Sequence, residues 1–232
     1  SLNVEKYDEW KEDENFPVER FVEREQMLLL TKTTGFGLPI MPPEFHDMGK
    51  PIISIAKFQK WLAERAEERG VEIITATAGN DLLYNEAGEV KGVRTRDRGL
   101  DGHGKPKDSF ELGADVHSKV TIIGEGPRGH LARILMEKYR LLDEGNPITY
   151  EMGCKEVLEF PKGTIKDGFV YLIAGYPLSE SLLRINSSTF GGAFIYSMAE
   201  DKVCIGLLAV LDAKNPDQDV QYMLQKLKLH PK

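Results

Sequence analysis

The chain has 232 residues, 41% of them hydrophobic and 29% charged, and a formal net charge of −7 at pH 7. This length and apolar content suffice for a hydrophobic core in one large or two small domains. The negative charge, without a basic run interleaved with aromatic residues, argues against a nucleic-acid-binding face.

Cysteine and hydropathy patterns exclude further classes. Cys154 and Cys204 give no disulfide framework and suit a reducing compartment, where we expect them to be small buried residues. The histidines show no metal-ligand spacing with cysteines or acids, so the sequence predicts no metal site. It shows no signal peptide and no apolar run of about 18 residues, so we expect no membrane-spanning segment.

The first 45 residues fall into two parts. Residues 1–26 are acidic and poor in core residues, which predicts a surface segment or linker. Residues 27–45 are rich in apolar side chains, but proline and glycine break them, so they cannot form one regular helix. Such a segment either packs on a sheet as a loop or dips into a membrane interface, and composition alone favours the loop.

The central part alternates predicted helices and strands. Phe58, Trp61, Leu62 and Ala66 mark one face of a helix that ends at Gly70. Residues 71–75 predict a strand. Residues 82–93 predict a hairpin with an Asn/Gly-type turn.

Residues 119–133 predict a nucleotide-binding turn. An apolar strand leads into Gly124, Gly126 and Gly129, spaced as G-x-G-x-x-G, and then into a helix. Glycines allow backbone N–H groups to approach a phosphate, and the helix N-terminus adds partial positive charge. Arg128 is the best phosphate ligand here, whereas His130 either contacts a ligand or caps the helix. The same pattern also occurs in turns that bind nothing.

The place of this turn in the chain decides which kind of turn it is. A dinucleotide fold opens with its glycine turn and has an acid about 20 residues later. Here more than a hundred residues precede the turn, and Glu144, which has the right spacing, lies in a predicted loop. The turn is therefore interpreted as a later strand-turn-helix that approaches the same cofactor from another side.

The last third is rich in strands. Residues 167–174, 193–198 and 202–210 are β-branched or aromatic runs, which predict an antiparallel sheet with one buried face. Gly191 and Gly192 either let the backbone approach a planar ring, since neither has a Cβ, or form a β-bulge that bends the strand.

Several separate motifs, in order, resemble one family. The chain is similar to electron-transfer flavoprotein:ubiquinone oxidoreductases and the related FixC-like proteins. The motifs that carry the resemblance are residues 30–32, 38–42, 114–122, 125–126, 129–132, 147–153, 155–157, 175–178 and 190–196. The pyrophosphate-binding turn that opens members of this family and their four-cysteine domain have no match, and residues 179–186 have no counterpart in the family.

The resemblance implies a fold class of α/β plus β: the central part of a glutathione-reductase-type FAD-binding fold, with an antiparallel-sheet quinone domain. It divides the chain into an acidic start and membrane- or quinone-facing segment (1–50), an FAD-binding portion (51–140) and a quinone-binding portion (141–232). The chain is then a middle section of a longer enzyme and inactive by itself.

The resemblance also assigns ligands and residues. FAD would contact Gly124, Glu125, Gly126, Arg128, Gly129 and His130, and a [4Fe-4S] cluster would belong to the longer protein only. Quinone would contact Phe190, Gly191, Gly192, Leu38, Ile40, Met41 and Phe45.

The implied reaction passes electrons from reduced electron-transfer flavoprotein to ubiquinone or menaquinone, without any catalytic acid or base from this chain. The implied location is the surface of a membrane: a bacterial or archaeal cytoplasmic face, or the mitochondrial inner membrane. Two alternatives remain, which are a geranylgeranyl-reductase-like flavoenzyme that reduces isoprenoid lipids and a non-catalytic binding module.

Overall fold

The computed structural model describes residues 10, 13–39, 41–143, 145–179, 190–213, 215 and 217–232. The chain divides into two compact units, one formed by Ser1–Val71 with Thr149–Lys232 and the other by Glu72–Ile148. Each unit is described by itself.

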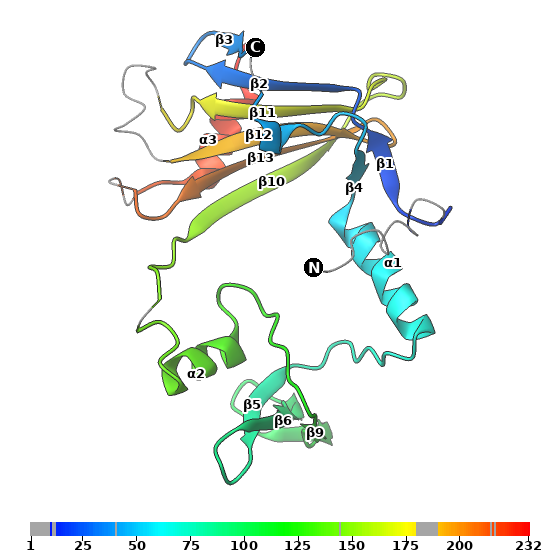
Figure 1. The fold of residues 1–232 in the computed structure, drawn as a ribbon, viewed down its shortest axis with the longest axis vertical. Coiled ribbons are helices and arrows are strands. Elements are labelled where there is room, and N and C mark those ends of the chain that lie inside the picture. The colour runs from blue at the N-terminus through cyan, green and yellow to red at the C-terminus, as the bar shows by residue number, and fades with distance from the viewer. Residues whose placement is uncertain are drawn as a thin grey trace. The chain divides into compact units, whose positions relative to one another are not determined.

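A six-stranded sheet is the centre of the first unit (Figure 1). Its strand order is β10-β13-β12-β11-β2-β3, and neighbouring strands are antiparallel except β2 and β11, which are parallel. The strands are β2 (Arg24–Leu30), β3 (Gly35–Gly37), β10 (Glu151–Glu159), β11 (Phe169–Gly175), β12 (Gly191–Met198) and β13 (Lys202–Val210). The three strands predicted in the last third of the sequence are confirmed.

Helix α3 (Val220–Lys228) covers one face of this sheet, behind the strands in Figure 1. The core beneath it joins Leu224 and Leu227 to Ile205, Leu207 and other buried residues. Leu224 is fully buried, and burying such a side chain contributes about 1.5–3 kcal/mol. Asp219 caps the helix by accepting a hydrogen bond from the Tyr222 amide at 2.9 Å.

The rest of the first unit is a two-stranded ribbon and a helix. Strands β1 (Val18–Phe21) and β4 (Pro51–Ile53) pair antiparallel. The short 3-10 helix η2 (Pro43–Phe45) precedes β4 in the chain, and α1 (Ile55–Glu68) follows it. The predicted helix end is confirmed. Gly70, at φ 82°, donates to the Glu67 carbonyl and Val71 to the Ala66 carbonyl, which is a Schellman motif.

The second unit contains two small antiparallel sheets and one helix. Strands β5 (Gly79–Tyr84), β6 (Val90–Thr95) and β9 (Asp115–His117) form one sheet, and β7 (Arg98–Leu100) and β8 (Pro106–Glu111) form the other. Helix α2 (His130–Lys138) packs on β5 through Leu131, which is buried. The predicted hairpin is confirmed by β5 and β6.

Two local predictions are wrong. Residues 71–75 and 119–123 form no strand, and the apolar segment before the glycine turn has no regular secondary structure and leaves Ile122 90% exposed. Strand formation needs a neighbouring strand to accept its hydrogen bonds, and the described part of the chain brings none alongside these residues. Conversely, β1 and β2 occupy part of residues 1–26, which therefore are not all linker. The sheet-rich, antiparallel character is as expected.

Candidate functional site

The sheet of the first unit has a second face, on the side away from α3. Side chains alternate between the faces of a strand. Ala193 and Ile195 belong to the core under α3, so Gly192, Phe194 and Tyr196 point to the second face. Register adds partly buried apolar neighbours there, which are Leu172, Ala174, Met27, Leu29 and Leu208. The second face is thus a mainly apolar surface that the helix leaves uncovered.

The two predicted glycines differ in surroundings. A Cβ at Gly191 would collide with the Leu208 carbonyl and approach Leu178, and its φ of 154° also favours glycine. Among the described residues, a Cβ at Gly192 would meet only the Ile173 carbonyl within 4 Å, at 3.2 Å. Gly191 is therefore required by the fold, whereas Gly192 leaves free space above the backbone of the second face.

Beside Gly192 lies a stacked aromatic pair. The rings of Phe194 and Tyr196 have centroids 5.8 Å apart and planes 20° apart. Gly206 makes room for Phe194, because a Cβ there would collide with the ring. Burial, with Cys204 beside it, raises the pKa of the Tyr196 phenol above its usual value, so the phenol stays neutral. Beside Gly192 the second face thus offers two flat rings and one neutral phenol.

The other described residues that were predicted to contact quinone belong to the same unit as this face. Phe190 precedes Gly191 and is 77% exposed. Leu38 follows the edge strand β3, and its amide donates to the Met27 carbonyl at 2.8 Å. Strand order puts it three strands from Gly192, about 14 Å at the usual spacing. Met41 is partly buried, Phe45 is 43% exposed, and Ile40 lies outside the described residues.

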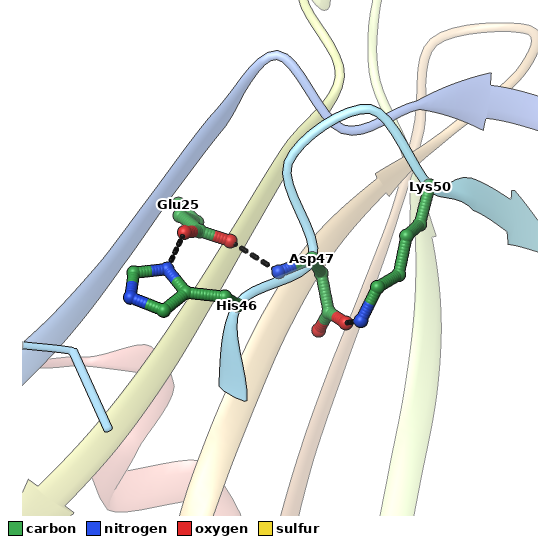
Figure 2. Close-up of polar contacts among 4 residues, drawn as sticks. All are labelled: Glu25, His46, Asp47 and Lys50. Atoms are coloured by element: carbon green, nitrogen blue, oxygen red, sulfur yellow. Dashed lines mark hydrogen bonds and ion pairs between the residues drawn. The ribbon is translucent and has the colours of Figure 1, made fainter. Parts of the chain in front are cut away.

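Sequence reasoning missed a polar cluster that holds the chain after Phe45 (Figure 2). Glu25, on β2, accepts hydrogen bonds from the Asp47 amide and the His46 ring nitrogen Nδ1, both at 2.6 Å. The Lys50 ammonium contacts the Asp47 carboxylate at 2.8 Å. The available signal was a charged residue that alternates with Met27 and Leu29 on the second face of an apolar strand.

The glycine turn belongs to the second unit and is partly open. A Cβ at Gly124 or Gly126 would meet nothing within 4 Å, and Gly126 has φ 78°. The Glu125 carboxylate, however, accepts from the Ala132 amide at 2.9 Å, so the chain's own acid caps α2. Arg128 is exposed, Gly129 is buried, and a His130 ring nitrogen lies 2.9 Å from the Asn80 carbonyl oxygen. The turn is therefore open at Gly124 and Gly126, while Glu125 already occupies an amide at the start of α2.

Comparison with known proteins shows which family the chain is similar to. Residues 150–232, which contain β10 to α3, match the family described as "ETF-QO, ubiquinone-binding". Curated relatives named electron transfer flavoprotein-ubiquinone oxidoreductase, mitochondrial, include those of Dictyostelium discoideum and Homo sapiens. The first is 37% identical over 96% of this chain and 35% of its own length, the second 34% identical over 98% and 36%.

A solved structure of a flavin-dependent brominase, Bmp2, aligns with 97% of this chain and 48% of its own at 12% identity. Its TM-score is 0.49, so the alignment adds nothing to the assignment.

Residues 150–232 thus form a sheet domain of the type that the matched family model describes as ubiquinone-binding. More particularly, the chain belongs to the electron transfer flavoprotein-ubiquinone oxidoreductase family, which confirms the resemblance seen in its motifs. It spans about a third of the length of the curated relatives it matches.

Proposed function

We propose that this chain is the quinone-facing part of a flavoprotein oxidoreductase that passes electrons from reduced electron transfer flavoprotein to a membrane quinone. The observation that carries the proposal is the second face of the sheet, which is apolar and has free space above Gly192, within the region matched to a ubiquinone-binding domain. The relatives' names mention both partners.

The second face suits a quinone ring for three reasons. A ring can lie flat against a strand where no Cβ intervenes, as at Gly192. Phe194 and Tyr196 offer ring faces beside it, and offset stacking of such rings contributes about 0.5–1.5 kcal/mol beyond burial. The side chains of Leu172, Leu29 and Leu208 are apolar, so a bound ring would exchange water for hydrocarbon.

FAD is proposed for the turn at Gly124, Glu125, Gly126, Arg128, Gly129 and His130, where it would supply the electrons. Gly124 and Gly126 leave the backbone accessible, and the exposed Arg128 can pair with a phosphate. Glu125 would position the turn through its bond to the Ala132 amide. A [4Fe-4S] cluster needs four thiolates, and this chain has two cysteines, so its ligands would lie in the longer protein.

Peripheral membrane contact is proposed for the segment from β3 to Met48, which includes η2. Phe36, Phe45 and Met48 are 53%, 43% and 56% exposed, and exposed apolar side chains of this kind mark interaction sites. No helix among the described residues is long and apolar enough to cross a bilayer. The proposed functional division into residues 1–50, 51–140 and 141–232 follows these sites. It crosses the two compact units, whose boundaries lie at residues 71 and 149.

The test replaces Gly192 with leucine in the longer protein. The new side chain would stand on the second face where the ring is proposed, so quinone reduction should fall at least tenfold, while flavin reduction by electron transfer flavoprotein continues. Gly102→Leu is the control, because among the described residues no atom lies within 4 Å of a Cβ at Gly102. Quinone reduction at the parent rate in Gly192→Leu would remove the quinone from this face and put the isoprenoid-reductase alternative ahead.

A further inference from the structure

A loop between β3 and β4 is fastened at two nearby points of β2. At one point the Leu38 amide donates to the Met27 carbonyl at 2.8 Å. At the other, the Asp47 amide donates to the Glu25 carboxylate at 2.6 Å. Glu25 and Met27 are two residues apart on one strand, about 7 Å. The described residues 39 and 41–46 therefore lie between two points of attachment that are close together on β2, as in a compact Ω-loop.

The second fastening depends mainly on one side chain. Glu25 is only 9% exposed in its side chain and faces the second face of the sheet. Its two carboxylate oxygens accept from two different donors, the Asp47 amide and the His46 ring (Figure 2). Backbone bonds extend the contact, from Gly49 to the Val22 carbonyl and from Val22 to the Lys50 carbonyl. The carboxylate thus joins strand and loop.

The chemistry of this site requires an ionised acid. A carboxylate is expensive to bury unless hydrogen bonds replace its water. Burial raises the pKa of Glu25, but the bonds from His46 and the Asp47 amide outweigh it, so the pKa lies below its usual 4.5. Glutamine would turn an NH₂ group toward one of the two donors, whereas glutamate accepts from both. Glu25 thus occupies a strand position that would otherwise suit an apolar residue, and its carboxylate holds the loop on β2.

We propose that Glu25 is a positioning residue for quinone access: its carboxylate holds the backbone at Asp47 on β2 and so fixes the described part of the segment between Leu38 and Asp47, which carries Met41 and Phe45. The inference rests on the proposed quinone function. Glu25 touches no reacting group in this account and acts through the loop. Its loss should weaken quinone binding more than it slows turnover at saturation.

The experiment compares Glu25→Ala and Glu25→Gln in the full-length protein. Removing a hydrogen-bonded charge shifts the equilibrium between the attached and the detached segment about tenfold. We therefore expect Glu25→Ala to raise KM for a short-chain ubiquinone analogue about tenfold with kcat nearly unchanged, and Glu25→Gln to raise it less. Hydrogen exchange supplies a second readout. The amides of Asp47 and Gly49 should exchange faster, while those of β11 and β12 stay protected.

Asp201 provides the matched control. Its carboxylate also holds a loop by two amides, accepting from Gly163 at 2.9 Å and Ile165 at 2.7 Å. Asp201→Ala should loosen residues 163–165 without changing KM for the quinone. If Glu25→Ala does not fold, Glu25→Gln carries the same comparison.

Two results would overturn the inference, and they differ in whether the proposed quinone function survives. Unchanged KM and unchanged exchange in the Glu25 variants, with Gly192→Leu still defective, would reject the positioning role and leave the quinone function standing. Normal quinone reduction in Gly192→Leu would reject both, even if the loop amides of the Glu25 variants exchange faster.

Discussion

At the scale of single residues, glycines do two different things in the sheet of the first unit. Gly191 and Gly206 serve the fold, because a Cβ would collide with the Leu208 carbonyl in one case and with the Phe194 ring in the other. Gly192 has no such neighbour beyond one carbonyl at 3.2 Å. Sequence alone treated Gly191 and Gly192 as equivalent, because nothing in a Gly-Gly pair shows which Cβ direction is blocked.

The role of Gly206 can be measured by unfolding. Gly206→Ala should destabilise the protein by about 1–3 kcal/mol, because the new methyl group overpacks against Phe194. Phe194→Leu in the same chain should recover part of that loss, since the smaller side chain frees the space. A double-mutant cycle in urea gives the coupling energy. Additive effects of the two substitutions would contradict this packing.

The carboxylates of Asp201 and Glu25, which each hold a loop, should make the stability of the protein depend on pH in the acid range. Hydrogen bonds lower the pKa of Asp201 below its usual 3.8, chiefly the one from the Gly163 amide, and the bonds to Glu25 lower its pKa despite burial. A lowered folded-state pKa means stability that is complete above the usual carboxyl pKa and is lost as pH falls through the lowered value. Thermal melts from pH 6 to 2 should therefore fall less steeply in Asp201→Asn. An unchanged slope would show that these bonds do not couple to folding.

At the scale of elements, the sequence predicted those whose partners are near in the chain. The hairpin of β5 and β6, the helix that ends at Gly70, and the successive strands β12 and β13 follow from local pattern and turn residues. Strand β2 could not be predicted in the same way. Its neighbour β11 lies more than a hundred residues later, and the pairing is parallel, so no local turn announces it.

The two failed strands have a common cause. Residues 71–75 and 119–123 have strand composition, yet Val71 is 53% and Val120 75% exposed. Such segments become strands when neighbours outside them accept their hydrogen bonds and cover their side chains. The strand prediction for these two segments assumed a neighbouring strand that the described part of the chain does not supply.

Hydrogen exchange tests this explanation directly. In the present chain the amides of residues 119–123 should exchange within seconds to minutes, as expected for unpaired backbone. In a longer protein of the same family, these amides should be protected if additional strands pair with them. Equal, fast exchange in both proteins would mean that the strand composition of residues 119–123 has no structural partner.

At the scale of the whole molecule, two kinds of surface are carried by two separate units. The sheet unit holds the second face with Gly192, and the smaller unit holds the glycine turn at Gly124 and Gly126. The candidate residues were found from motifs, because glycine patterns are visible in sequence. Glu25 was not, because its importance depends on which side chains the fold brings to it, His46 and the Asp47 amide among them.

The most direct test of the central claim is photolabelling of the full-length protein with an azido-ubiquinone analogue, followed by mapping of the labelled peptides. The account predicts that label falls on β12 and β13, around Gly192, Phe194 and Leu208, and that excess ubiquinone prevents it. Label that ubiquinone displaces from other segments, with β12 and β13 unmodified, would contradict a quinone on the second face of this sheet.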